Sequence, residues 1–123
     1  MPADDTDLEN AYSDQDYIDV NTKNDVWVEQ TASSEYAMHQ FKDYVGGSPS
    51  ANLEWEGQSD LAPSSSTVYL QIYNRDTPGW ETIDSDDSTA ANTDFSLIAN
   101  IADLTNYKDG SNVISCRVFQ EAI

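Results

Sequence analysis

The residues of this chain that could do chemistry are mostly carboxylates. Asp84, Asp86 and Asp87 stand at spacings at which oxygen ligands can hold a calcium ion. The twelve-residue helix-loop-helix pattern is absent, because Phe95 stands where that pattern needs a bidentate glutamate. A chance Asp-x-Asp-Asp run is expected in a chain so rich in aspartate, so we predict no bound metal ion.

The other catalytic sets are incomplete. Glu54 and Glu56 flank Trp55 on a strand-like segment, where both point into solvent, whereas a glycosidase needs two carboxyls facing each other across a cleft. The single histidine, His39, and the single cysteine, Cys116, fall in different expected strands, and Cys116 is typical of a small buried residue. The sequence holds no Gly-x-Ser-x-Gly elbow and no glycine-rich phosphate loop. We therefore expect no enzymatic activity and no cofactor.

Aromatic side chains are better candidates, and they point to binding. Tyr69 and Tyr73 are expected on the non-core side of a strand, where they can form an aromatic platform with Trp80. Such rings hold sugars through the sugars' apolar C–H faces, or they anchor a protein partner. In the simpler alternative they only pack against cross-strand neighbours. Of the two binding uses we favour a protein contact. The candidate contact face comprises Tyr69, Tyr73, Trp80 and Phe119.

A hairpin within residues 66–83 must position these rings. Val68, Leu70 and Ile72 alternate with polar or aromatic residues, which is the period of a β-strand. The following Asn-Arg-Asp-Thr-Pro-Gly at 74–79 has the composition of a turn, and residues 80–83 form the returning strand. The pattern predicts a hairpin at the centre of an all-β domain.

Further strand-like segments flank this hairpin, namely residues 17–20, 26–29, 35–45, 52–57, 93–98 and 113–120. Residues 35–45 contain some helix-favouring side chains, but their aromatic residues favour a long strand. We expect a solvated loop at 84–89, and a short helical turn or an extended connection at 101–107. About eight short strands predict an all-β fold, an antiparallel β-sandwich of jelly-roll type. It spans residues 16–123 as a single domain and follows an acidic, flexible arm at 1–15.

The charge restricts the partners. The chain has 23 Asp and Glu against five Lys and Arg, a formal net charge of −18. This field repels nucleic acid and anionic membranes, so we expect neither as a partner. Self-repulsion opposes folding in dilute buffer, but at 1 M salt the screening length falls to about 3 Å. The composition thus favours a protein of a salt-accumulating halophile over a calcium-binding protein or an ordinary acidic surface.

No targeting segment is evident from the sequence. The first residues have neither the basic region nor the apolar run of a signal peptide, and no segment approaches the roughly 20 apolar residues of a membrane span. We expect synthesis in the cytosol.

Several motifs resemble those of a known kind of domain. They are Trp-Glu-Gly at 55–57, Val-Tyr-Leu-Gln-Ile-Tyr-Asn-Arg at 68–75, Trp-Glu-Thr-Ile at 80–83 and the closing Cys-Arg-Val-Phe at 116–119. Over about residues 50–123 the chain resembles a recurrent β-sandwich domain of tailed-virus structural proteins and large cell-surface proteins. More distantly it is similar to galactose-binding-type jelly rolls, many of which are carbohydrate-binding modules.

The resemblance and the acidic composition together imply a role in the virion of a virus with a salt-loving host. The expected function is a structural virion protein, either capsid decoration or a tail or spike component. It would assemble with other virion proteins, as a homo-oligomer. The alternatives are a stand-alone carbohydrate-binding module that holds glycan on Tyr69, Tyr73 and Trp80, and a secreted filament subunit joined by strand exchange.

Overall fold

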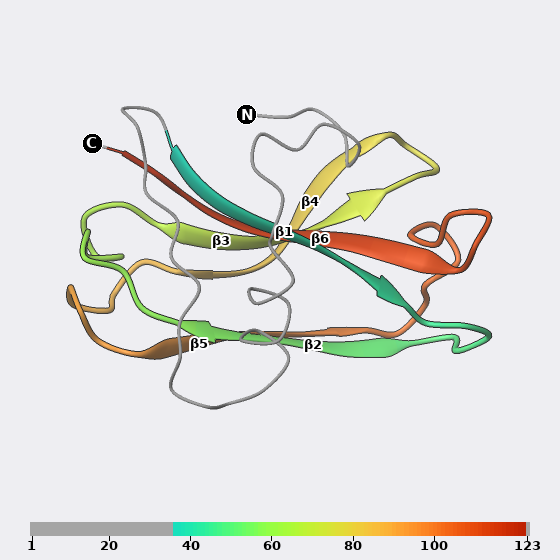
Figure 1. Cartoon of the computed structure of the whole chain (residues 1–123), viewed down its shortest axis with the longest axis horizontal. Helices are drawn as coiled ribbons and strands as arrows, with labels where there is room; N and C mark the ends of the chain where they lie inside the picture. The colour runs from blue at the N-terminus through green and yellow to red at the C-terminus, as the bar shows by residue number, and fades with distance from the viewer. Residues whose placement is uncertain (1–35, 123) are drawn as a thin grey trace, which may run out of the picture.

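Six β-strands form the part of the protein that the computed structural model describes, residues 36–122 (Figure 1). They are β1 (Tyr36–Tyr44), β2 (Ala51–Gly57), β3 (Val68–Asn74), β4 (Gly79–Asp86), β5 (Phe95–Ile101) and β6 (Val113–Glu121). No residue of this part is helical. The predicted all-β fold is therefore confirmed, and the strand expected within 35–45 is β1, at Tyr36–Tyr44. The expected strands at 17–20 and 26–29 and the expected arm at 1–15 lie outside the described residues.

The strand pairing is nested. β1 pairs with β6, β2 with β5 and β3 with β4, in each case antiparallel. A further antiparallel pairing of β3 with β6 gives a four-stranded sheet of order β1-β6-β3-β4, which faces a two-stranded sheet of β2 and β5. Figure 1 shows the two sheets as an upper and a lower layer. First-with-last pairing across two sheets is the scheme of a jelly roll, here with six described strands instead of about eight.

The core lies between the sheets and follows the alternation of the sequence. Val68, Leu70 and Ile72 of β3 are at most 3% exposed, while the residues between them are half-buried. On β5, Phe95 and Leu97 face them, as predicted. Each such side chain stabilises the fold by roughly 1.5–3 kcal/mol through burial. Alternating aliphatic side chains thus join the two layers.

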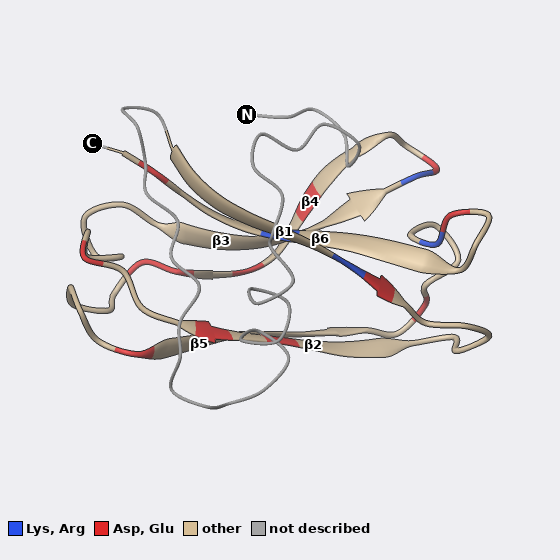
Figure 2. Cartoon of the chain, in the orientation of Figure 1, with Lys and Arg blue, Asp and Glu red and all other residues tan. Residues whose placement is uncertain are grey.

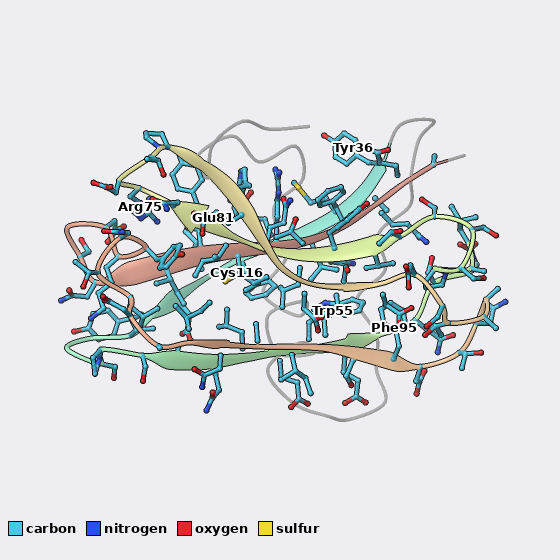
Figure 3. The ribbon with its side chains drawn as sticks, turned by 180° about the vertical axis from the view of Figure 1, so that it is seen from behind. Tyr36, Trp55, Arg75, Glu81, Phe95 and Cys116 are labelled. Carbon is cyan, nitrogen blue, oxygen red and sulfur yellow. The ribbon has the colours of Figure 1, made fainter. Side chains whose placement is uncertain are left out.

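The second layer has its own close contact. Trp55 of β2 packs on Phe95 of β5, with ring centroids 5.5 Å apart, and Figure 3 shows both rings between the sheets. The indole of Trp55 lies over Gly57, where a Cβ atom would overlap the ring. A side chain at this position would therefore force the Trp55 ring to move.

The predicted turn at 74–79 is confirmed. β3 ends at Asn74 and β4 begins at Gly79. The Oδ1 atom of buried Asn74 accepts hydrogen bonds from the backbone N–H groups of Asp76 (2.9 Å) and Thr77 (3.0 Å). An asparagine at the first position of a turn makes this type of bond to the residues that follow.

The expectation of a solvated loop from Asp84 onward was wrong for residues 84–86, because β4 continues to Asp86. The carboxylate of Asp84 accepts a hydrogen bond from the backbone N–H of Ile98 on β5 (2.8 Å). This side chain therefore links the edge of one sheet to the edge of the other, and a register shift between Leu70 and Gln71 accompanies it on β3.

Residues 101–107 contain a hydrogen-bonded turn, one of the two forms expected. The carbonyl oxygen of Leu104 accepts bonds from the N–H groups of Tyr107 (3.0 Å) and Lys108 (3.2 Å), and the Leu104 side chain is fully buried. β5 itself runs three residues past the expected end, to Ile101, because Ala99 and Ile101 continue its inward-facing row.

Neighbouring residues of β5 provide a matched test of this core. Leu97 is 0% exposed and Ile98 is 60% exposed. We expect Leu97→Ala to lower the free energy of unfolding by about 3 kcal/mol, through lost burial and a residual cavity. Ile98→Ala should lower it by less than about 1 kcal/mol. Denaturant unfolding in molar salt measures both values, and equal losses would contradict the assigned facing of β5.

Candidate contact surface

The four aromatic residues singled out in the sequence lie together on the outer face of the four-stranded sheet. Tyr69 on β3 lies opposite Phe119 on β6, and their rings stack with centroids 5.0 Å apart. Tyr73 on β3 lies opposite Trp80 on β4, and these rings meet edge to face at 5.3 Å. The expected placement on the non-core side is therefore confirmed, while their role in binding stays a prediction. We call these four residues, together with Arg117, the aromatic face.

Arg117 is the residue of this face that sequence reasoning missed. It lies opposite Gln71, and its Nε–H donates to the Gln71 side-chain oxygen (2.8 Å). Its guanidinium carbon lies 4.3 Å from the ring centroid of Trp80 and 5.3 Å from that of Phe119. Only 5% of Arg117 is exposed, and burial lowers its pKa to about 10, which leaves it a cation at neutral pH. A desolvated cation on an aromatic ring contributes up to about 2 kcal/mol.

The exposed part of the aromatic face is smaller than the sequence suggested. Tyr69, Tyr73 and Trp80 are half-buried, while Phe119 is only 7% exposed and forms the floor beside Arg117. The indole nitrogen of Trp80 is buried and has no hydrogen-bond acceptor among the described residues. Such an orphaned donor costs roughly 1–3 kcal/mol. The face therefore combines covered aromatic rings with one unused donor.

A polar cluster fastens the β3–β4 hairpin to the loop before β6. The carboxylate of Glu81 accepts hydrogen bonds from the Tyr107 hydroxyl and from the Asn74 amide, both at 2.7 Å. These bonds, that from Tyr107 foremost, lower the pKa of Glu81, and the bond to Glu81 raises the pKa of Tyr107. A general acid needs a raised carboxyl pKa, and the pKa of Glu81 is shifted in the opposite direction.

Arg75 and Lys108 connect loops at the same end of the sandwich as the Glu81 cluster. Figure 3 shows Arg75 close to Glu81 at the hairpin turn. The Nε–H of Arg75 donates to the carbonyl oxygen of Tyr107 (2.9 Å), and a terminal nitrogen donates to the hydroxyl of Ser115 (3.2 Å). Lys108 donates to the carbonyl oxygen of Gly46 (3.0 Å). These cations thus hold loops together through neutral oxygens.

The aspartates considered for calcium use their oxygens within the fold. Asp84 accepts from the N–H groups of Ser85 and Ile98, one on each oxygen. Asp86 accepts from the N–H groups of Ser88 and Thr89 on one oxygen and from the Thr89 hydroxyl on the other. Burial alone raises the pKa of Asp86, but these hydrogen bonds outweigh it and hold the pKa below its ordinary value. Among residues 36–122, no cluster of three or more His, Cys, Asp or Glu side chains is arranged for a metal ion.

Cys116 and His39 lie on neighbouring strands, closer than their sequence separation suggests. β1 pairs with β6, so that Cys116 lies opposite Phe41 and His39 lies opposite Val118. Cys116 is 1% exposed, and burial, with a smaller effect of Asp43, raises the pKa of its thiol to about 12. A thiol with this pKa stays protonated at neutral pH and is a poor nucleophile.

The remaining candidate carboxylates, Glu54 and Glu56, are exposed on the outer side of β2, away from Trp55 as expected. No helix in the described part of the chain is long and apolar enough to cross a membrane.

Comparison of the chain with protein-family models, with curated proteins and with solved structures finds no match in any of the three. Function is therefore inferred from the geometry described above and from the composition.

The Glu81 cluster makes stability depend on pH in a defined direction. Because the folded-state pKa of Glu81 lies below its unfolded value of 4.5, its contribution is complete above pH 4.5 and is lost as the pH falls through the folded-state pKa. We expect Glu81→Gln to destabilise the protein by about 1 kcal/mol at pH 7, allowing for partial exposure. This difference from wild type should shrink in acid. Tyr107→Phe should show the same pH dependence. Urea unfolding measures the free energy of unfolding of each variant, and a loss that does not change with pH would contradict the role assigned to the Glu81 carboxylate.

Proposed function

We propose that this chain is a structural protein that acts by assembly, a capsid-decorating, tail or spike component of a virion adapted to high salt. Its partners are other virion proteins, including further copies of itself. In this proposal the chain binds and does not catalyse. The place of action is the virion, after synthesis in the host cytoplasm.

The observation that carries the proposal is the aromatic face. Aromatic residues and arginine are the side chains most enriched where proteins bind one another tightly. Tyr69, Tyr73 and Trp80 are half-buried, so their rings are held in place and lose little conformational freedom on binding. The two central strands beneath them, β3 and β6, are fixed by the core. A rigid sheet with ordered rings on its outer side suits a permanent contact.

The ring geometry favours a protein partner over a sugar. A sugar stacks on a free and flat ring face. Here one side of Trp80 lies under the Arg117 guanidinium, Tyr69 stacks on Phe119, and the Arg75 guanidinium lies 5.4 Å from the Tyr73 centroid. The rings are thus already engaged with each other and with cations. A carbohydrate-binding module remains the alternative, and strand exchange in a secreted filament is the third.

The distribution of charge supports the adaptation to high salt. None of the described Asp and Glu side chains is buried, and most are exposed. Figure 2 shows them along the two-stranded sheet and in the loops. Arg75, Lys108 and Arg117 donate to neutral oxygens of the fold. The surface of this part is accordingly acidic, and mutual repulsion of its carboxylates is relieved when salt screens them.

We expect the full-length protein to assemble in molar salt, as measured by light scattering. Tyr73→Ala removes a half-buried ring of the aromatic face. The protein concentration at which assembly is half complete should then rise at least tenfold, a loss of about 1.4 kcal/mol in association free energy. Ile98→Ala, an exposed substitution on the opposite sheet, is the control and should leave assembly intact. Purely monomeric wild type, or equal loss in both variants, argues against the proposal. If the wild type binds a glycan on an array and Tyr73→Ala abolishes that binding, the carbohydrate-binding module would replace the assembly proposal.

We also expect stability to rise with salt. At pH 7 the midpoint of thermal unfolding should be at least about 5 °C lower in dilute buffer than in molar salt, corresponding to about 1 kcal/mol for a domain of this size. Near the isoelectric point of about 4.1 the net charge vanishes, so the salt effect should shrink there. Equal midpoints at both salt concentrations at pH 7 would refute the adaptation.

A further inference from the structure

The outer edge of β5 differs from the other edges of the two described sheets, because β5 carries no charged side chain. The other edge strands, β1, β2 and β4, each contain Asp, Glu or Lys. β5 has the sequence Phe-Ser-Leu-Ile-Ala-Asn-Ile, without proline or glycine. An uncharged segment of this kind at the edge of a sheet is a template on which another strand can pair.

The backbone groups at this edge belong to Ser96, Ile98 and Asn100. Among the described strands β5 pairs with β2 alone, and the N–H of Ile98 points away from β2, towards Asp84. Backbone groups alternate between the two edges of a strand, so those of Ser96 and Asn100 point the same way as those of Ile98. The Ile98 side chain is 60% exposed. An incoming strand would therefore meet backbone partners and an apolar side chain at one place.

Asp84 reaches this edge from the core side of β4. Its register partner is the core residue Leu70, so its side chain lies on the inner side of the four-stranded sheet. The register shift leaves Ile83 as an extra residue between Asp84 and Thr82, and Ile83 packs against the core. In Figure 1 the end of β4 runs from the upper layer towards the lower one before the chain enters β5. An inward-pointing charge and a bulge are both means of preventing a sheet edge from pairing.

We propose that Asp84 blocks pairing of β5 with the β5 strand of a second copy of this chain. Its carboxylate accepts the hydrogen bond from the Ile98 N–H (2.8 Å) and so takes the place of the carbonyl oxygen of an incoming strand. Ile98 is the middle one of the three residues whose backbone groups point to this edge. Loss of Asp84 opens the edge. This role goes beyond the proposed function, because the aromatic face lies on the other sheet.

The composition of β5 favours a second β5 as the strand that Asp84 excludes. In an antiparallel pair centred on Ile98, the two Ile98 side chains lie opposite each other, and Ser96 of each copy lies opposite Asn100 of the other. No like charges meet in this contact, although a chain of net charge −18 otherwise repels a second copy. Two-fold symmetry closes the contact and joins the sheets in the order β2-β5-β5-β2.

Light scattering in molar salt tests the role of Asp84. Every variant carries Tyr73→Ala, which weakens assembly through the aromatic face. We expect Asp84→Ala to form dimers at a protein concentration at least about tenfold lower than the Tyr73→Ala background does. Asp87→Ala removes an equal charge from the exposed loop after β4 and should leave the background unchanged. Equal dimerisation of both variants, or of neither, would overturn the proposal.

Two further variants separate edge pairing from association of unfolded protein. Leu97→Ala weakens the core beneath the same strand and leaves Asp84 in place, so it should stay monomeric. Adding Ile98→Lys to Asp84→Ala places like charges opposite each other at the centre of the pair and should restore the monomer. Dimers of Leu97→Ala would assign the association to lost stability instead. Dimers that persist with Ile98→Lys would place the contact elsewhere, and either result contradicts the role of Asp84.

Hydrogen exchange of the Ile98 amide measures the contact itself. Below the dimerisation concentration of Asp84→Ala, this amide should exchange at least about tenfold faster than in the background. Above that concentration its protection should return, because the N–H then pairs with the second copy. An Ile98 amide that stays unprotected in the dimer would rule out pairing through β5. Because each value is compared with the Tyr73→Ala background, failure of the assembly role of the aromatic face leaves this test intact.

Discussion

Burial of β6 on both of its sides is the constraint on which the rest of the structure depends. Its inner side chains, Ile114, Cys116 and Val118, close the core between the sheets, and its outer ones include Arg117 and Phe119. β6 lies between β1 and β3, so the last strand completes a sheet that the first strand begins. The pairings of β6 with β1 and with β3 therefore join residues that are far apart in the chain, and this one strand contributes to both the core and the aromatic face.

The sequence predicted the architecture well where one strand face differs from the other. In β3 the alternation of aliphatic with polar and aromatic residues identified both the core side and the outer side. The prediction failed at Asp84, because acidic residues after Ile83 were interpreted as a solvated loop. The carboxylate of Asp84 instead accepts a bond from Ile98, which lies 14 residues further along the chain. Nothing in the local pattern indicates which distant N–H group comes within reach of a side chain.

The sequence predicted the aromatic residues of the contact face but not its cation, Arg117. Alternation alone placed Tyr69, Tyr73, Trp80 and Phe119 away from the core, and the registers of β3 with β4 and β6 bring them together. The same alternation places Arg117 on the side of Phe119, but it does not identify Arg117 as part of the contact face. Its burial depends on Trp80, which lies two strands away, and only the sheet order supplies that contact. Its position between Cys116 and Val118 in an apolar strand was the one available signal.

The contacts of the cations explain how such an acidic chain can hold a specific shape when salt is high. Screening over about 3 Å removes repulsion between carboxylates separated by more than that distance. The bonds of Arg75 and Lys108 to carbonyl oxygens, and the stacking of Arg117 on Trp80, act at direct contact and largely escape screening. Salt therefore weakens the carboxylate repulsion that opposes folding more than it weakens the contacts of the cations that stabilise the fold.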